Sequence, residues 1–335
     1  MNILSIETSC DETSAAVVEN GTDILSNVIA TQIEFHQKYG GIVPEIASRK
    51  HIEVISPIIQ QALDKANIQF SDLDAIAVTY GPGLVGALLV GVCAAKAIAY
   101  SLKIPLIGVN HLEGHICANF LSRRVEVRFP FICLIVSGGH TSLVLVKGHG
   151  EYQTIGRTRD DAAGEVFDKI SRFLGLGYPG GPIIDEMSRK GNPSAIDFPR
   201  AMMDKEYGYD FSFSGIKTAV VNHVKKWPVS SCRYSIEDLL SSFQEAVVDV
   251  LVEKSICAAK EHNIRTIALA GGVSCNSRLR TKMLERGSAE EIKIIFPAPI
   301  LCTDNAAMIA CAGYFWFKKG ITSSWDLKAV ANLEI

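Results

Sequence analysis

The sequence predicts an α/β protein built from two similar halves. Of its 335 residues, 48% are hydrophobic, which is typical of a folded globular enzyme and excludes a disordered or fibrous chain. A strand, a polar turn and a second strand open each half, and a strand–glycine turn–helix–strand unit closes each half. The length suits two domains of ordinary size, and we expect them to cover residues 1–128 and 129–335.

The first half begins with three expected strands, at residues 3–6, 15–18 and 24–29. Asn20-Gly21 predicts a hairpin turn between the second and third strands. A strand at 75–79, a helix and a strand ending at Val109 follow as a βαβ unit. The apolar run of this helix, Leu84 to Ala95, is shorter than the roughly 20 residues that cross a membrane, so we expect a buried helix.

The second half repeats the same arrangement. We expect strands at 131–136, 143–146, 152–155, 266–270 and 292–296, with helices at 159–169 and 276–285. Glycine pairs follow two of these strands, at Gly138-Gly139 and at Gly271-Gly272. Their backbone N–H groups suit binding of phosphate. Two halves that face each other would form a cleft where such turns converge.

Charge and cysteine content limit the partners and the compartment. The net charge of −3 gives no general attraction for nucleic acid or for an anionic membrane, so RNA binding needs local patches or partner proteins. Nine cysteines without a CxxC pair predict reduced thiols, buried at Cys93, Cys133 and Cys311. The first residues lack a basic segment followed by an apolar run, so we expect no signal peptide and a cytoplasmic location.

His111-Leu-Glu-Gly-His115 is the most informative segment of the chain. On a helix, positions four apart share one face, which suits two imidazoles that bind one metal ion. Two helix histidines satisfied by backbone or water are an equal alternative at this point. Glu113 lies about 200° from His111 around the helix and points away. A zinc protease places its glutamate directly after the first histidine, so the spacing disfavours a peptidase.

Several other polar residues have simple structural explanations. Asp304 and Asn276 each precede an expected helix, where a capping role is common. Asp161, Glu165 and Asp168 form an acidic stripe on the helix at 159–169, and a solvated face is the default interpretation. Residues 179–182 suit a rigid turn.

Five separated motifs carry a family resemblance. They are Ile6-Glu-Thr-Ser-Cys-Asp-Glu-Thr13, His111-Leu-Glu-Gly-His115, Val136-Ser-Gly-Gly-His-Thr141, Phe211-Ser-Phe-Ser-Gly-Ile-Lys-Thr218 and Cys302-Thr-Asp-Asn-Ala-Ala307. Together they resemble the bacterial tRNA N6-adenosine threonylcarbamoyltransferases, formerly called glycoproteases, from Met1 to about Ala331. One slight departure is Ser274-Cys275, where many relatives have alanines; Asn276 is kept.

The resemblance implies a fold, an activity and a cofactor. The fold is the duplicated actin-like, or ribonuclease H-like, fold of sugar kinases and Hsp70 ATPases. The activity is transfer of threonylcarbamoyl from threonylcarbamoyl-AMP to N6 of adenosine 37 in tRNAs that read codons beginning with A. The cofactor is one divalent transition metal, iron in preference to zinc, held by His111, His115 and Asp304. With Asp304 in the second half, this metal would bridge the halves.

The resemblance also implies substrate residues. Asp168 would bind the ribose hydroxyls, and the other expected contacts to the adenylate are Ile135, Val136, Ser137, Gly138, Gly139, Gly181, Asp185 and Asn276. His140 and Glu12 are candidate proton acceptors. The sequence shows no obvious nucleophile, and the mixed anhydride of threonylcarbamoyl-AMP is already activated, so positioning and charge stabilisation suffice.

The expected partners are tRNA, a non-catalytic paralogue of the same fold and a P-loop ATPase in one complex. Apolar faces around 52–63 and 84–102 are candidates for the paralogue. Candidate phosphate contacts are Arg123-Arg124, Lys225-Lys226-Trp227, Arg278, Arg280, Lys282 and Lys318-Lys319. The alternatives are a small-molecule kinase or ATPase of the same fold and a nucleotide-binding scaffold without activity. Neither needs a His/His/Asp site.

Overall fold

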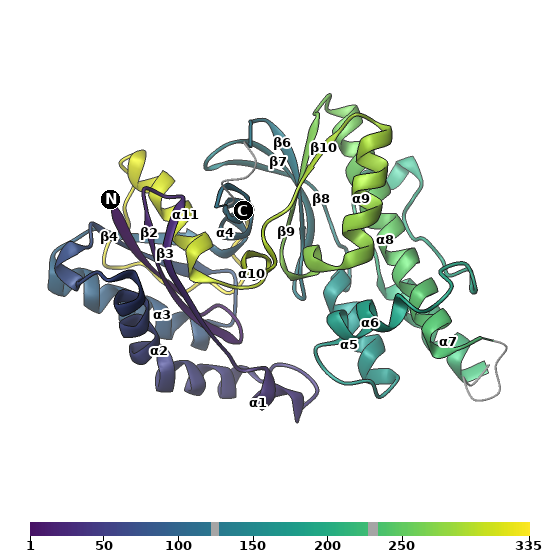
Figure 1. Ribbon diagram of the computed structural model, residues 1–335, viewed down its shortest axis with the longest axis horizontal. Coiled ribbons are helices and arrows are strands. Elements are labelled where there is room, and N and C mark those ends of the chain that lie inside the picture. Colours follow the sequence, from purple (N-terminus) through teal and green to yellow (C-terminus); the bar gives the residue numbers. More distant parts are fainter. Residues whose placement is uncertain (122–126, 227–233) are drawn as a thin grey trace. The chain divides into compact units, whose positions relative to one another are not determined.

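The structure is a computed structural model that describes residues 1–121, 127–226 and 234–335. The chain forms two compact units, each with one five-stranded sheet and flanking helices (Figure 1). Unit 1 comprises Met1–Val127, Gly148–Tyr152 and Pro297–Ile335, and unit 2 comprises Arg128–Lys147 and Gln153–Phe296. The predicted α/β class is confirmed. Arg123, Arg124 and Trp227, which we named as candidate phosphate contacts, lie outside the described residues.

The sheet of unit 1 has the strand order β3-β2-β1-β4-β5. Its strands are β1 (Asn2–Glu7), β2 (Glu12–Glu19), β3 (Asp23–Thr31), β4 (Ala75–Gly81) and β5 (Leu106–Asn110). β1 to β3 form an antiparallel meander, whereas β4 and β5 run parallel to β1. The hairpin turn at Asn20 and Gly21 has φ values of 51° and 78°, as its sequence predicted.

Helices cover both faces of this sheet. α2 (Pro44–Ala66) and α3 (Val85–Leu102) pack on the face that carries Leu4 and Ile6. α4 (His111–Cys117) and α11 (Ala306–Lys318) pack on the face that carries Ile3 (Figure 1). Alternate side chains of β1 therefore enter different cores, as the two-residue period of a strand requires. The short elements of this unit are α1 (Ile33–Gln37), η1 (Phe70–Asp72), η2 (Ala118–Phe120) and α10 (Pro299–Cys302).

Helix α3 continues beyond the apolar run, through Lys96 to Leu102, in agreement with the apolar face expected at 84–102. Among the described residues, it is the one helix whose length and composition would allow it to cross a membrane. The core helix of a folded domain has the same properties, and Leu88 and Val92 lie in the core of unit 1. Cys93 is exposed on the outer face, so its predicted burial is wrong, whereas Cys133 and Cys311 are buried as predicted.

The sheet of unit 2 has the order β10-β9-β6-β7-β8, which repeats the arrangement of unit 1 strand for strand. Its strands are β6 (Phe131–Val136), β7 (Thr141–Gly148), β8 (Glu151–Arg157), β9 (Thr266–Ala270) and β10 (Lys293–Ile295). β7 is antiparallel to β6, and β9 is parallel to it. The duplication inferred from the sequence is therefore present in both sheets. The tip of the β7–β8 hairpin belongs to unit 1.

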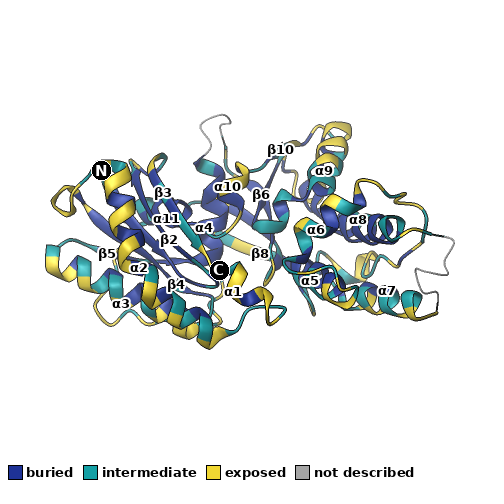
Figure 2. Cartoon of the chain, turned by 60° about the horizontal axis from the view of Figure 1, so that its bottom comes forward, coloured by how far each residue is buried: buried dark blue, intermediate teal, exposed yellow. Residues whose placement is uncertain are grey.

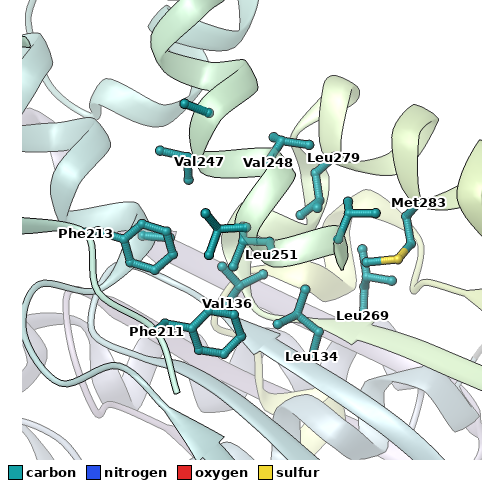
Figure 3. Close-up of a cluster of buried hydrophobic side chains, with 14 of the residues drawn as sticks. Leu134, Val136, Phe211, Phe213, Val247, Val248, Leu251, Leu269, Leu279 and Met283 are labelled. Atoms are coloured by element: carbon teal, nitrogen blue, oxygen red, sulfur yellow. The ribbon is translucent and has the colours of Figure 1, made fainter. Parts of the chain in front are cut away.

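One long helix organises the core of unit 2. α8 (Ile236–Glu261), which the sequence analysis did not predict, is buried along most of its length (Figure 2). Its side chain Leu251 lies among Leu134, Phe213 and Leu279 in the core drawn in Figure 3. The other helices are α5 (Ala163–Phe173), α6 (Gly180–Ser188), α7 (Ser214–Lys226), α9 (Ser277–Ala289) and the short η3 (Lys205–Tyr207) and η5 (Gly272–Cys275).

Two expectations need correction. α5 begins at Ala163 rather than at residue 159, because Asp160 instead accepts hydrogen bonds from Phe213 N and from the Ser214 hydroxyl. Asp304, expected in the second half, lies in unit 1 with both histidines. The reason is α11: its first seven residues are fully buried against the sheet of unit 1, and this returns the chain to that unit.

Candidate functional site

Three side chains of unit 1 converge, and two of them share the helix face that the HxxxH spacing predicted. His111 and His115 occupy one side of α4, with ring centroids 4.7 Å apart. The carboxylate oxygen Oδ1 of Asp304 lies 3.5 Å from His111 Nε2 and 3.2 Å from His115 Nε2. A set of possible ligand atoms from the three residues lies within 4.8 Å of one another. This is the N, N, O donor geometry of a candidate metal site.

Helix caps place these side chains. Asn110 caps α4 because its Oδ1 accepts from the backbone N–H of Leu112 at 2.8 Å. Asn305 caps α11, where its Oδ1 accepts from Met308 N at 3.1 Å. Asp304 is therefore not the N-cap that its sequence position alone favoured, and its carboxylate is directed to the histidines instead.

A buried layer behind His111 orients its ring. Glu7, which is fully buried at the end of β1, has Oε2 3.0 Å from His111 Nδ1. The same oxygen accepts from the Thr79 hydroxyl at 2.6 Å, and Ser9 Oγ lies 3.1 Å from His111 Nδ1. Engaging Nδ1 leaves Nε2 to face Asp304. Glu7 and Ser9 were not predicted as site residues; the available signal was an acidic residue directly after Ile6 in the first strand.

The electrostatics of this cluster favour a positive charge at its centre. Burial tends to lower the pKa of His111, but the charges of Asp304 and Glu7 outweigh it and raise that pKa to about 9. Burial tends to raise the pKa of Glu7, but the charge and hydrogen bond of His111 outweigh it and lower that pKa. Burial and the nearby Asp11 and Asp304 carboxylates raise the pKa of Glu12 well above its usual range.

The residues present fit a metal ion. Within the described parts of the chain, the buried Nδ1 and Nε2 atoms of His115 make no hydrogen bond, although Nε2 lies 3.2 Å from Asp304 Oδ1. A buried imidazole without a partner is costly in free energy, and a cation held between the Nε2 atoms and Asp304 would satisfy one of these nitrogens. Two neutral imidazoles and one carboxylate match the preferences of iron and zinc.

Glu113 is engaged elsewhere, as its position on α4 predicted. Its two carboxylate oxygens accept from the Tyr152 hydroxyl and from Trp316 Nε1, each at 2.8 Å. Its side chain is thus bound to the β7–β8 hairpin tip and to α11. This placement agrees with the spacing argument, which disfavours a peptidase.

In unit 2, a tight turn follows β6. Ser137 N donates to His140 O at 2.8 Å, and His140 N donates to Ser137 Oγ at 3.1 Å. Gly138 and Gly139 between them are exposed and have open space on the side where a Cβ would stand. The side chains of Ile135 and Val136 are fully buried in β6, so only their backbone atoms are available to a ligand.

The second glycine pair lies beside this turn. A Cβ at Gly271, whose φ is +86°, would stand 2.4 Å from Val136 O, so the ends of β9 and β6 are in close contact. The start of α5 is also near, since Gly164 N donates to Ser137 O at 3.1 Å. The two glycine turns thus lie close together within unit 2, and their expected convergence in a cleft between the halves stays a prediction.

The four remaining predicted substrate residues surround the starts of α6 and α9. Asp168 on α5 accepts from Gly180 N at 2.6 Å, next to Gly181. Asp185 accepts from the Ser277 hydroxyl at 2.8 Å and pairs with Arg189 at 2.9 Å. Asn276 caps α9, as its sequence position predicted: its Oδ1 accepts from Leu279 N at 2.9 Å. Each of these polar side chains therefore already has a structural partner.

Most candidate tRNA contacts on α9 are neutralised by other groups. Arg278 and Lys282 both pair with Glu245, each at 2.6 Å, and Arg280 donates to Ser274 O at 2.6 Å. Lys225 and Lys226, at the end of α7, are exposed. Among the described candidates, the cations on α9 therefore interact with other protein groups, whereas the two lysines at the end of α7 are accessible to solvent.

Comparison with known proteins identifies close relatives. The family model for tRNA N6-adenosine threonylcarbamoyltransferase matches residues 23–311. Proteins of that name from Clostridium novyi and from Clostridioides difficile are 56% and 57% identical over 335 and 332 residues. The matches cover 100% and 99% of this chain, and 98% of each relative.

Solved structures support the fold. Full-length HypF in a phosphate- and nucleotide-bound form matches 97% of this chain and 47% of its own, with a TM-score of 0.64 at 13% identity. The activator of 2-hydroxyisocaproyl-CoA dehydratase from Clostridium difficile, with bound ADPNP, matches 96% and 97% with a TM-score of 0.54 at 14% identity. At these identities the likeness concerns the fold alone, which is the expected actin-like fold.

The raised pKa of His111 predicts a pH dependence for the metal-free protein. A histidine whose pKa rises from 6.5 to about 9 on folding contributes stability that is full below pH 6.5. That contribution is lost as the pH rises through about 9, and it amounts to about 3 kcal/mol. Urea unfolding in the presence of a chelator at pH 6.5 and above 9 measures it. Buried thiols such as Cys133, whose pKa burial raises, lower stability above pH 9 in any variant, so the difference between proteins is what counts. His111→Gln should lose less stability than the wild type over this range, and an equal loss in that variant contradicts the assignment.

Proposed function

Since the chain belongs to the family of tRNA N6-adenosine threonylcarbamoyltransferases, we propose that it transfers threonylcarbamoyl from threonylcarbamoyl-AMP to N6 of adenosine 37. The tRNAs modified are those that read codons beginning with A. The observation that carries this proposal is the match along the whole chain at 56% identity. Membership in this family supports a transferase that acts on tRNA. It does not support the alternatives of a kinase, an ATPase or a scaffold of the same fold.

The metal of this reaction belongs at His111, His115 and Asp304. We expect one divalent transition metal, iron in preference to zinc, which when bound supplies a Lewis acid for the substrate oxygens. Glu7 supports the site by fixing the ring of His111 through Nδ1, at 3.0 Å. The close approach of the three donor groups and the unpartnered His115 nitrogens support this assignment.

The adenylate belongs in unit 2, at the turn after β6. The exposed amides of Gly138 and Gly139 suit the phosphate, and the Asp168 carboxylate suits the ribose hydroxyls. A carboxylate has about four acceptor sites, so Asp168 can hold Gly180 N and still accept from a ribose. The other proposed contacts are Gly181, Asp185, Asn276 and Ser137, with Ile135 and Val136 contributing backbone atoms.

The transfer needs little covalent help from the protein. The N6 amine attacks the carbamoyl carbon, the new C–N bond forms, and the C–O bond to the phosphate of AMP breaks. The amine must also lose a proton. Glu12 is one candidate acceptor, because its raised pKa brings a carboxylate closer to the range of an effective base. His140, in the turn after β6, is the other candidate.

Partners complete the proposal. With a net charge of −3 and with the cations of α9 paired, the chain has only a weak positive electrostatic potential to attract tRNA. Other chains must therefore help to bind it. Exposed apolar side chains on α3 and α2 suit a paralogue of the same fold: Val85 is 47% exposed, Leu89 46% and Ile52 65% (Figure 2). A P-loop ATPase is the third expected member. The location proposed for this complex is the cytoplasm.

Substitution of the ligands tests the metal assignment. His111→Ala, His115→Ala and Asp304→Ala should each lower the metal content from about one per chain, because three protein ligands are needed to hold the ion tightly. Metal analysis of the purified full chain is the measurement. His262→Ala, at an exposed histidine of unit 2, is the control. Full metal content in all three ligand variants would remove the site.

Asp168 can be tested with its structural bond preserved. Asp168→Asn keeps an oxygen for Gly180 N but removes the charge, and should weaken adenine-nucleotide binding by about 1–3 kcal/mol. Calorimetry on the full chain measures this change. Glu165→Gln, on the same helix, removes the charge of a partly exposed carboxylate and keeps an oxygen for Ala162 N, so it should have no effect. Unchanged affinity in Asp168→Asn would place the ribose elsewhere.

Reconstitution tests the activity and the need for partners. The isolated chain, given threonylcarbamoyl-AMP and unmodified tRNA, should turn over poorly and should bind tRNA with strong salt dependence. Addition of the paralogue and the ATPase should restore modification, measured by mass spectrometry of the nucleosides. Lys225→Ala with Lys226→Ala should weaken tRNA binding and leave the metal content unchanged. Rapid multiple turnover by the chain alone would refute the dependence on partners.

A further inference from the structure

We infer that Glu113 is a positioning residue for the metal site. It joins the helix that carries both histidines to the helix that follows Asp304, and so fixes the ligands relative to one another. The inference rests on the proposed metal site at His111, His115 and Asp304. It gives a role to the central residue of the HLEGH segment, which binds neither metal nor substrate in the proposal above.

The hydrogen bonds of Glu113 carry the argument. The side chain is nearly inaccessible, with 4% of the residue exposed, and both of its oxygens are used. Oε1 accepts from the Tyr152 hydroxyl and Oε2 accepts from Trp316 Nε1, each at 2.8 Å. A buried carboxylate is costly unless it is hydrogen-bonded, so these two donors hold it firmly in place. All three residues belong to unit 1.

Helix α4 needs such support from outside. It has only seven residues, all buried, and so few of its own backbone hydrogen bonds fix its direction. Gly114 sets its approach to α11, since a Cβ there would stand 2.6 Å from Ile309 Cδ1. Glu113 sets its rotation, because the bond to Trp316 ties it to the same helix α11. α11 begins two residues after Asp304, so the bond joins the two ligand-bearing regions.

The same geometry separates positioning from acid–base chemistry. Both Glu113 oxygens are occupied by protein donors, and the residue is too buried to meet a substrate. Glutamine preserves the arrangement: its carbonyl oxygen can accept from Trp316, and its NH₂ can donate to the Tyr152 oxygen, because a hydroxyl also accepts. A positioning role therefore tolerates Glu113→Gln, whereas a role that needs the charge does not.

Metal binding to the full chain tests the inference, with Zn²⁺ and Co²⁺ as the probes. Tyr152→Phe removes one donor and keeps the ring, and Trp316→Phe removes the other donor and keeps a smaller aromatic ring. The double variant should bind Zn²⁺ about 10–100-fold more weakly in a chelator competition. The visible spectrum of bound Co²⁺, which reports ligand geometry, should change as well. Glu113→Ala should behave like the double variant, and Glu113→Gln like the wild type. Trp325→Phe, at a tryptophan that is 51% exposed, is the matched control.

The outcomes are distinct. Wild-type Zn²⁺ affinity and Co²⁺ spectrum in the double variant, together with loss of metal in His111→Ala, would overturn the positioning role and leave the metal site standing. Retention of metal in His111→Ala would overturn the metal site itself. Loss of affinity in Glu113→Gln equal to that in Glu113→Ala would show that the charge is required and would also overturn the inference. Glu113→Gln and the single Phe variants cover the case in which Glu113→Ala fails to fold.

Discussion

The packing of α11 against the sheet of unit 1 is the constraint on which the candidate metal site depends. The helix is apolar at its start, and Ala306 to Ala312 are fully buried against strands that begin the chain. Two hydrogen bonds seat its first residue: the Ser5 hydroxyl donates to Ala306 O at 2.6 Å, and Ala306 N donates to Ser14 Oγ at 2.9 Å. These contacts fix the position of Asp304, which lies two residues before Ala306. Burial of an apolar helix therefore determines where a polar ligand stands.

A second constraint is the burial of like charges around one imidazole. Glu7 is fully buried, Asp304 is partly buried, and both carboxylates lie close to His111. One fully buried and one partly buried carboxylate favour a compensating cation, because an unpaired buried charge is costly. In the metal-free protein the His111 proton supplies part of that charge, which is why its pKa is high. A divalent cation supplies more charge at the same place, so the proton and the metal compete for one site.

The sequence predicted the repeated sheet architecture well, because it depends on local patterns. Apolar strands such as 131–136 and the hairpin at Asn20-Gly21 are determined by a few neighbouring residues, and the structure has them where expected. The existence of α8 was not predicted. The inner face of α8 is defined by packing from several distant segments rather than by a simple amphipathic stripe.

At the candidate metal site, too, local sequence patterns predicted only the features that neighbouring residues determine. The face shared by His111 and His115 follows from helical period alone, so the spacing was sufficient. The assignment of Asp304 came from the family resemblance, and its unit was wrong because chain order does not reveal that α11 returns to the first sheet. Glu7 and the partners of Glu113 lie far from α4 in sequence, and only the fold brings them to it.

In unit 2, the candidate substrate residues also hold the fold together, and this affects how their substitution must be interpreted. Asn276 caps α9, and its side-chain amide donates to Gln244 Oε1 at 2.7 Å. Asp185 accepts a hydrogen bond from the Ser277 hydroxyl. Loss of a cap alone costs about 1 kcal/mol of stability. Truncation of Asn276 to alanine would thus reduce nucleotide binding even without a direct contact, by loosening the start of α9. Asn276→Asp keeps the oxygen that caps α9 and removes the amide, which is the donor both to Gln244 and to any ligand. Comparison of Asn276→Asp with Asn276→Ala therefore separates the effect of the cap from the effect of the amide.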